Sequence, residues 1–255
     1  MNVDSGRVQD LIRAVTFDLW NTLIENRDYT AQRINFLSAK LEEMGYSFAK
    51  DDLTEAFVSS LDYVYRVWET ENHRFVPNME RLEYILQKLK AQVPEDQKKE
   101  IVTFFEEVAL KDPPPLIKEA KGVLEYLRSR YQMAIISDSG FTPARILRKI
   151  LQKNGVLDFF VVTVFSDEVG FNKPHRMMFE RVFSRLSVKP SEALHVGDLL
   201  HTDVAGAKAF GMKSIWLNKE KERKAAEAFN PDFTVNKVCE IIEILNNIGQ
   251  QEKPV

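Results

Sequence analysis

The sequence predicts an α/β protein in which a parallel β-sheet core is interrupted by an inserted all-helical segment. Short apolar runs rich in β-branched residues alternate with segments of helical periodicity, which is typical of a parallel sheet with helices on both faces. Residues 29–109 break this alternation, because they show several amphipathic helical patterns and no convincing strand pattern. With 255 residues, 44% of them hydrophobic, the chain is long enough to form one large domain, or a core domain with a smaller insert.

Apolar runs of strand length predict the sheet. They lie at residues 14–19, 133–136, 160–165, 193–196 and 214–217, with a weaker candidate at 233–235. Because these runs are apolar throughout, we expect strands that are buried on both faces. Helices are expected between the strands, at residues 118–129, 143–152, 174–186 and 203–210.

The insert is predicted to be a bundle of amphipathic helices. These helices are expected at residues 30–44, 52–71, 79–89 and 95–109. Several aromatic side chains of the insert are expected to pack its helices together rather than to line a pocket. They are Tyr63, Tyr65, Trp68 and Phe75.

The boundaries of the insert are marked by composition. A polar run at residues 25–28 precedes it, and consecutive prolines at 113–115 follow it. Consecutive prolines forbid helix and favour an extended, rather stiff connector. We therefore expect a core made of residues 1–26 and 113–255, and a helical domain of residues 27–112.

Composition excludes several classes of partner and site. The formal charge is -3 and no dense cluster of Lys and Arg is present, so nucleic acid is not an expected partner. Cys239 is the only cysteine, which excludes a disulfide within the chain and a thiolate metal site, and with four scattered histidines no zinc site is expected. The longest apolar run, residues 159–165, is too short to span a bilayer, and residues 1–13 contain no apolar signal region. We expect a cytoplasmic protein that does not associate with membranes.

In an open parallel sheet, ligands bind at the carboxyl ends of the strands, near the point where the strand order reverses. Polar residues lie at these ends of several predicted strands. Asp18 follows the first strand, and a charge so close to a buried strand is costly unless it meets a metal or hydrogen-bond donors. Ser137 ends another strand, where small hydroxyl donors suit a tetrahedral oxyanion. Taken alone, each has an ordinary alternative, a loop-capping Asp or a simple turn.

Two later segments complete the set. Lys173 precedes Pro174, which suits the first position of a helix, so a cation would stand beside free helical amides; a solvated surface lysine is the ordinary alternative. Asp198 ends the fourth strand and has no capping role, whereas Asp203 is placed to be a helix N-cap. Carboxylates from separate strand ends, facing Asp18, are what a hard cation such as Mg²⁺ requires.

The order of these residues resembles the four motifs of the haloacid dehalogenase superfamily. The match runs through Asp18, Ser137, Lys173-Pro174 and Gly197-Asp198 with Asp203, and it covers essentially the whole core. The insert resembles that superfamily's helical type 1 cap. The resemblance implies a Rossmann-like core bearing a cap, and a hydrolase that uses Mg²⁺.

The resemblance also implies roles for single residues. Asp18 would be the nucleophile of a phosphatase that acts on a small phosphorylated metabolite through a covalent aspartyl-phosphate, with Ser137 and Lys173 as the other catalytic residues. The phosphate-binding residues would be Asn21, Thr22, Ser137, Asp138 and Lys173. The metal would be held by Asp18, the backbone carbonyl of Trp20, Asp198 and Asp203, the last as a ligand or as a partner of the ligands.

Trp20 departs from the pattern of these phosphatases, which usually carry a second Asp two residues after the nucleophile. That Asp exchanges protons with the leaving alcohol and with water, a contribution of about 10²–10⁴-fold, and an indole cannot replace it. Asp138, His175 or His201 could supply the missing proton exchange. Alternatively, Trp20 only packs in the core, as an aromatic after a strand often does.

Other functions therefore stay open. The 2-haloacid dehalogenases have an aromatic residue at this place, although Asp198 and Asp203 argue against them because those enzymes lack the metal-binding acids. Phosphonatase-like members use a lysine of the cap as an imine-forming base, but none of the insert's candidates stands out. These candidates are Lys40, Lys50, Lys88 and Lys90. A transferase with a long-lived aspartyl-phosphate, or a degenerate protein with a binding role, completes the alternatives.

Overall fold

The core is a parallel β-sheet. The computed structural model describes residues 11–219 and 226–251, and its six strands run in the order β3-β2-β1-β4-β5-β6, all parallel. The strands are β1 (Ala14–Phe17), β2 (Gln132–Ser137), β3 (Val162–Phe165), β4 (Ala193–Gly197), β5 (Lys213–Leu217) and β6 (Phe233–Val235). The α/β class and every expected strand are confirmed, including the weaker one at 233–235.

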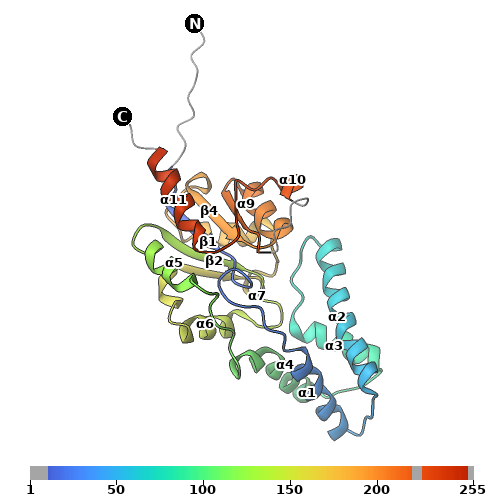
Figure 1. Cartoon of the computed structure of the whole chain (residues 1–255). Helices are drawn as coiled ribbons and strands as arrows, with labels where there is room; N and C mark the ends of the chain where they lie inside the picture. The colour runs from blue at the N-terminus through green and yellow to red at the C-terminus, as the bar shows by residue number, and fades with distance from the viewer. Residues whose placement is uncertain (1–10, 220–225, 252–255) are drawn as a thin grey trace.

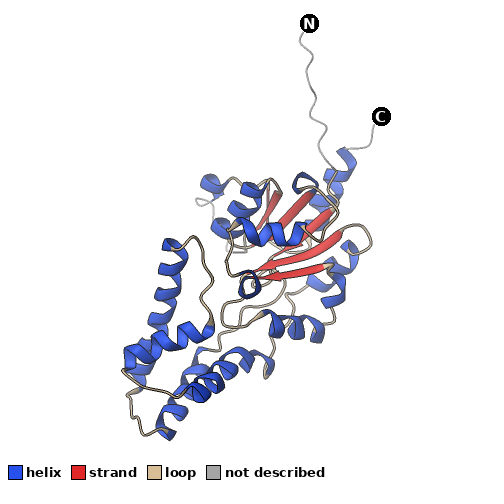
Figure 2. Ribbon diagram, turned by 180° about the vertical axis from the view of Figure 1, so that it is seen from behind, coloured by secondary structure: helices blue, strands red, loops and turns tan. Residues whose placement is uncertain are grey.

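Helices cover both faces of the sheet (Figure 2). One face packs against α5 (Ala120–Leu127), α6 (Ala144–Lys153) and α11 (Glu240–Gln251), and the other against α8 (Arg176–Phe183) and α9 (Ala205–Phe210). Side chains of one strand alternate between the faces, so Val15 and Phe17 join the first core and Ala14 joins the second. The two short helices are α7 (Ser166–Val169) and α10 (Ala226–Phe229).

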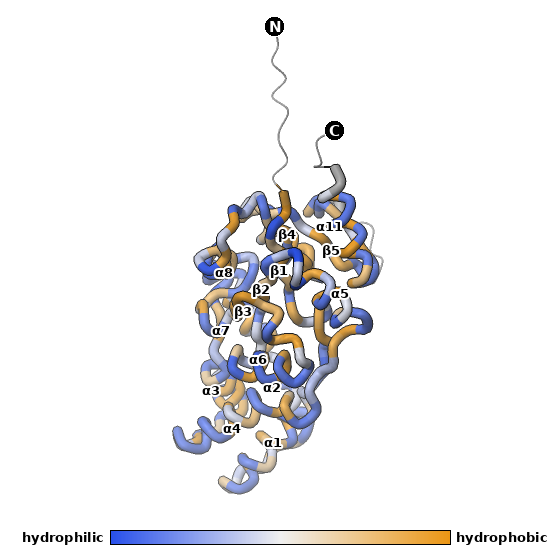
Figure 3. Tube along the Cα trace, turned by 90° about the vertical axis from the view of Figure 1, so that its left-hand side faces the viewer, coloured by the Kyte–Doolittle hydropathy of each residue, from blue (hydrophilic) through white to orange (hydrophobic). Residues whose placement is uncertain are grey.

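The insert is all-helical, as expected, and Figures 1 and 2 show its helices grouped at one end of the molecule. They are α1 (Thr30–Glu43), α2 (Lys50–Thr70), α3 (Asn78–Leu89) and α4 (Glu95–Glu107). Each carries polar and apolar residues in alternation (Figure 3), and the apolar ones, such as Leu37, Phe57 and Leu82, form a core of their own. We propose that residues 27–112 form the cap. None of the described helices combines the length and apolarity that spanning a membrane requires.

Two local expectations near the site were wrong. Helix α8 begins at Arg176 with His175 as its N-cap, so Pro174 is not its first residue and Lys173 does not adjoin its free amides. Asp203 is not an N-cap either, because it lies inside a single π-helical turn, Leu200–Val204, that precedes α9. The reason is that its carboxylate is engaged elsewhere, accepting a bond from the backbone N–H of Leu199. Single π-helical turns are frequent at functional sites.

Candidate active site

The strand order brings three acidic residues to one edge of the sheet. Strand β1 lies between β2 and β4, so the residues that follow these three strands are neighbours in space. They are Asp18 after β1, Asp138 after β2 and Asp198 after β4. The chain order reverses at β1, which is where ligands bind in open parallel sheets.

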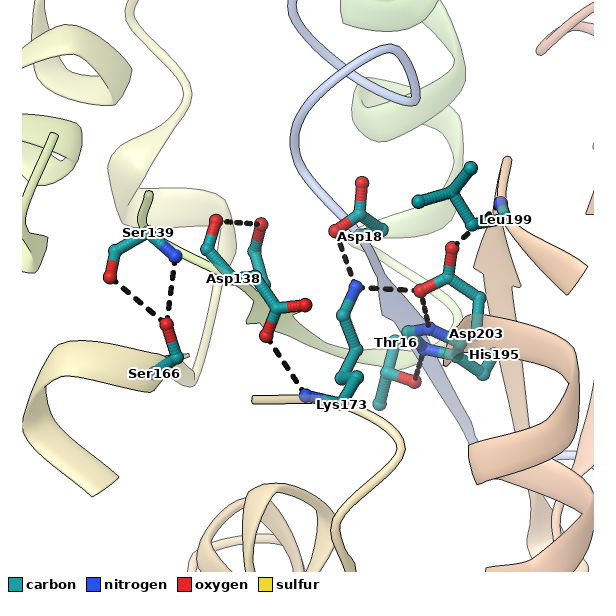
Figure 4. Close-up of polar contacts among 10 residues, drawn as sticks. Thr16, Asp18, Asp138, Ser139, Ser166, Lys173, His195, Leu199 and Asp203 are labelled. Carbon is teal, nitrogen blue, oxygen red and sulfur yellow. Dashed lines mark hydrogen bonds and ion pairs between the residues drawn. The ribbon is translucent and has the colours of Figure 1, made fainter. Parts of the chain in front are cut away.

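The side chain of Lys173 reaches between the carboxylates of Asp18 and Asp203 (Figure 4). Its Nζ lies 2.5 Å from Oδ1 of Asp18 and 2.6 Å from Oδ1 of Asp203. Its side chain is only 2% exposed, which excludes the alternative of a solvated surface lysine. Burial alone would lower the pKa of Lys173, but Asp18 and Asp203 raise it above its ordinary value, so the ammonium is retained.

Asp203 is fixed by a chain of buried polar groups. His195 Nε2 lies 3.3 Å from Asp203 Oδ1, and His195 Nδ1 lies 2.8 Å from the hydroxyl of Thr16 (Figure 4). Burial alone would raise the pKa of Asp203, but Lys173 and His195 hold it below its ordinary value. His195, which lies inside β4, therefore positions a residue of the site. This role is not predicted from the sequence, although Thr16 and His195 are polar residues paired in register within apolar strands.

Gly197, the last residue of β4, is needed because Asp203 packs directly against it. A Cβ built on Gly197 would lie 2.2 Å from Cγ of Asp203. No side chain fits at that distance, so the glycine allows the strand end and the carboxylate to approach each other.

Three carboxylates at this edge could hold a metal ion. Asp18, Asp198 and Asp203 each offer an oxygen, and these oxygens lie within 4.8 Å of one another. Burial raises the pKa of Asp18, and burial with repulsion from Asp18 and Asp203 raises that of Asp198 to about 7. One ammonium cannot balance three carboxylates, and a divalent cation that prefers oxygen ligands would offset the excess. The residues present therefore fit Mg²⁺.

The two carboxylates with the freer oxygens are Asp18 and Asp198. Asp203 engages one oxygen with Lys173 and His195 and the other with the N–H of Leu199. The side chain of Asp198 accepts no hydrogen bond from another described residue. Because both of its oxygens already accept hydrogen bonds, Asp203 is better placed to orient Lys173 than to coordinate a metal.

A cavity of about 570 Å³ opens at this edge, between the core and the helical insert. Most of the residues expected in the site line it, namely Asp18, Trp20, Asn21, Asp138, Lys173 and Asp198. Ser137 and Asp203 are buried and do not line the cavity, and the Ser137 hydroxyl donates a hydrogen bond of 3.4 Å to the backbone carbonyl of Asp138. Thr22 is not brought to the cavity, since it is fully buried and its hydroxyl has no hydrogen-bond partner among the described residues.

Comparison with known proteins identifies the family. Residues 12–211 match the family of haloacid dehalogenase-like hydrolases. The chain belongs to the haloacid dehalogenase-like hydrolases. The expected superfamily and the expectation of a hydrolase are thereby confirmed.

Two relatives of this hydrolase and one solved structure illustrate the match. The chain is 31% identical over 137 residues to a glyceraldehyde 3-phosphate phosphatase of Pyrococcus furiosus, covering 53% of this chain and 56% of that relative, slightly more than half its length. It is 25% identical over 237 residues to a ribulose-1,5-bisphosphate 5-phosphatase of Halopiger xanaduensis, covering 92% and 97%. The structure of a 2-haloacid dehalogenase from Pseudomonas syringae matches with a TM-score of 0.71 at 23% identity, covering 93% of this chain and 99% of that one, and shows the fold.

Of the candidate proton-exchanging residues in this hydrolase, Asp138 alone lines the cavity. Its Oδ1 accepts a bond of 2.9 Å from the backbone N–H of Lys173, and its other oxygen has no partner among the described residues (Figure 4). Burial raises the pKa of Asp138 to about 7. His175 caps α8 and stacks on Phe171, and His201 is exposed.

The insert contributes residues to the hydrolase cavity that were not predicted from the sequence. Arg33 of α1 and Arg81 of α3 are buried and line it. Their signal was a charge on an apolar helical face, since Arg33 precedes Leu37 by one turn and both are buried. The expectation for Tyr65 was wrong, because this side chain is 66% exposed and lies on the cavity wall instead of packing helices together.

Proposed function

We propose that this hydrolase is a Mg²⁺-dependent phosphatase that acts on a small phosphorylated metabolite through an aspartyl-phosphate at Asp18. The observation that carries the proposal is the buried ammonium of Lys173, held against Asp18 and Asp203 beside the carboxylate of Asp198. This arrangement supplies a nucleophile, a cation for an anionic substrate and an oxygen-rich metal site together. The phosphatases among its relatives support the same reaction class.

The residues would divide the reaction as follows. A carboxylate oxygen of Asp18 attacks phosphorus, the bond from phosphorus to the leaving oxygen breaks, and an aspartyl-phosphate forms. Lys173 offsets the repulsion between the two anions as they approach. Ser137, whose hydroxyl lies beside the Asp18 carboxylate, can donate its hydrogen to a phosphoryl oxygen. Mg²⁺, held by Asp18 and Asp198 with the Trp20 carbonyl, would polarise the phosphoryl group.

Trp20 occupies the place of the second Asp that usually exchanges protons in these phosphatases. We assign the proton exchange to Asp138 instead. Its carboxyl group faces the cavity and has a pKa raised to about 7, so both of its forms are populated near neutral pH. Asp138 gives its proton to the leaving alkoxide. It then takes a proton from water as that water attacks phosphorus and breaks the bond to Asp18, which regenerates both carboxyl groups and releases phosphate.

The proposed function is tested by phosphate release from an aryl phosphate and a panel of phosphomonoesters, with Mg²⁺ and with chelator. We expect release that requires Mg²⁺ and that Asp18→Asn abolishes. Asp62→Asn is the matched control, since Asp62 is an exposed aspartate of α2. Full turnover by Asp18→Asn, or equal rates in chelator, would contradict the proposal.

The role of Asp138 has its own test. We expect Asp138→Asn to lower kcat by about 10²–10⁴-fold for alkyl phosphates, which need a protonated leaving group. An aryl phosphate with a good leaving group should lose less in the first step, and the descending limb of the pH profile near pH 7 should vanish. Equal losses on both substrates with an unchanged profile would show that Asp138 exchanges no proton.

One observation favours a second candidate function, 2-haloacid dehalogenation. Trp20 lies on the cavity wall where phosphatases of this family have an acid, and halide leaves without a proton. Halide release from a 2-haloacid, measured beside the phosphate assay, separates the two reactions. Release of halide in chelator with no release of phosphate would favour the dehalogenase.

A further inference from the structure

Two buried arginines of the insert face the cavity that contains Asp18. Arg33 of α1 is 6% exposed and Arg81 of α3 is 5% exposed, and both line the cavity. They flank the ring of Phe141, with their guanidinium carbons 4.7 and 4.6 Å from its centroid. Two positive charges of the insert thus line the same cavity as the carboxylates of the core.

Neither arginine forms an ion pair with a described acidic residue. Each commits its Nε to a backbone carbonyl, Arg33 to Phe105 at 3.0 Å and Arg81 to Val76 at 3.3 Å. No described residue accepts a hydrogen bond from their terminal nitrogens. Four N–H donors on each guanidinium group therefore remain available.

The two acidic side chains whose charges act on these arginines each accept hydrogen bonds from other residues. The negative charge of Asp28 stabilises the protonated form of Arg33, but Asp28 accepts a hydrogen bond of 2.8 Å from the N–H of Thr30. The negative charge of Glu80 stabilises the protonated form of Arg81, but the two oxygens of Glu80 each lie 2.9 Å from the guanidinium of Arg74.

The charges of the pair are costly as they stand. Burial lowers the pKa of Arg33 and of Arg81 to about 10, and repulsion from Arg33 adds to the effect on Arg81. Both remain charged at neutral pH. Buried cations without an anion are unfavourable, and planar guanidinium donors match the oxygens of a phosphate or carboxylate. An anion bound by these donors would offset the two charges.

We propose that Arg33 and Arg81 bind a second anionic group of the substrate, a phosphate or a carboxylate, while its phosphoryl ester lies at Asp18. The substrate would then be a small phosphomonoester with a second anion at its other end. A cavity of about 570 Å³ has the size of sites that hold such metabolites. This inference rests on the proposed function for the reacting end of the substrate.

The test compares matched phosphomonoesters. Glycerol 3-phosphate with 3-phosphoglycerate tests a carboxylate, and fructose 6-phosphate with fructose 1,6-bisphosphate tests a second phosphate. We expect kcat/KM to favour the doubly anionic member of at least one pair by about 10–100-fold. The pair with the larger preference identifies the anion.

The preference should fall toward one in Arg33→Met and in Arg81→Met. Arg66→Met is the matched control, since Arg66 is an exposed arginine of α2 that does not line the cavity, and it should keep the preference. Phosphate release with no preference in either pair, or a preference unchanged in both arginine variants, would overturn the inference and leave the proposed function intact.

A binding measurement distinguishes failure of the proposed function from failure of the arginine site. If no ester releases phosphate, the proposed function is wrong, and the arginine site is judged from the Tm of wild type in chelator with added inorganic phosphate. We expect phosphate to raise Tm in wild type and in Arg66→Met, and to raise it less in Arg33→Met and Arg81→Met. An equal rise in all four proteins would overturn the inference.

Discussion

Replacing Lys173 by methionine should destabilise the metal-free protein, because the variant leaves two buried carboxylates without their cation. At an effective dielectric constant of about 20, each contact of 2.5–2.6 Å represents an attraction of about 6 kcal/mol, most of which offsets the desolvation of the charges. Removing one partner of a buried ion pair costs about 3–5 kcal/mol. We expect a loss of this size in the free energy of unfolding at pH 8 in chelator.

The loss should depend on pH with a definite sign. Lys173 holds the pKa of Asp203 below its ordinary value, so Asp203 contributes stability above its unfolded pKa and loses it as the pH falls through the folded pKa. In Lys173→Met the buried Asp18 and Asp203 can take up protons instead, which relieves their charges as the pH falls. The difference from wild type should therefore be larger at pH 8 than at pH 5.

Urea unfolding followed by tryptophan fluorescence measures both effects. The matched control is Lys40→Met, since Lys40 also contacts two carboxylates, those of Glu43 and Glu100, but both of these carboxylates are exposed. Added Mg²⁺ should restore part of the stability of Lys173→Met. A loss no larger than that of Lys40→Met, or one that grows toward pH 5, would refute the reasoning.

Two further predictions concern the edge of the sheet that carries the carboxylates. Gly197→Ala should lower the free energy of unfolding by about 1–3 kcal/mol, because the new Cβ would displace Asp203. It should also reduce Mg²⁺ affinity, because Asp203 positions Lys173, which contacts Asp18. Urea unfolding and calorimetry measure the two effects, and Gly122→Ala, with open space around its Cβ, is the control that should show neither. Because burial and repulsion from Asp18 and Asp203 raise the pKa of Asp198 to about 7, Mg²⁺ must displace a proton at lower pH, so its affinity should fall roughly tenfold per pH unit below pH 7. Calorimetric titration between pH 5 and 8 measures this slope, and a flat profile, or an equally steep one in Asp198→Asn, would contradict the assignment of Asp198.

The sheet could be predicted because its signal is local. Strands buried on both faces must be apolar throughout, so the runs at 14–19 and 193–196 marked their own positions. The π-helical turn at Leu200–Val204 could not be predicted, because it depends on where Asp203 points, and that is set by Lys173, a residue of another segment.

The residues that the core contributes to the site could be predicted from the sequence, whereas those of the insert could not. Residues of the core side follow strands, so the topology of a parallel sheet places Asp18, Asp138 and Asp198 at one edge. Residues of the insert side reach the cavity only through the packing of helices against the core. Arg33 and Arg81 therefore appeared in the sequence only as charges on apolar helical faces, with no indication of what they face.

The covalent intermediate tests the central claim most directly. Wild type is mixed with a phosphomonoester and Mg²⁺, quenched in acid within one turnover, digested at low pH and examined by mass spectrometry. We predict one phosphoryl group on the peptide that contains Asp18, and none in Asp18→Asn. Phosphate release by wild type without phosphorylation of that peptide, combined with turnover by Asp18→Asn, would contradict the account.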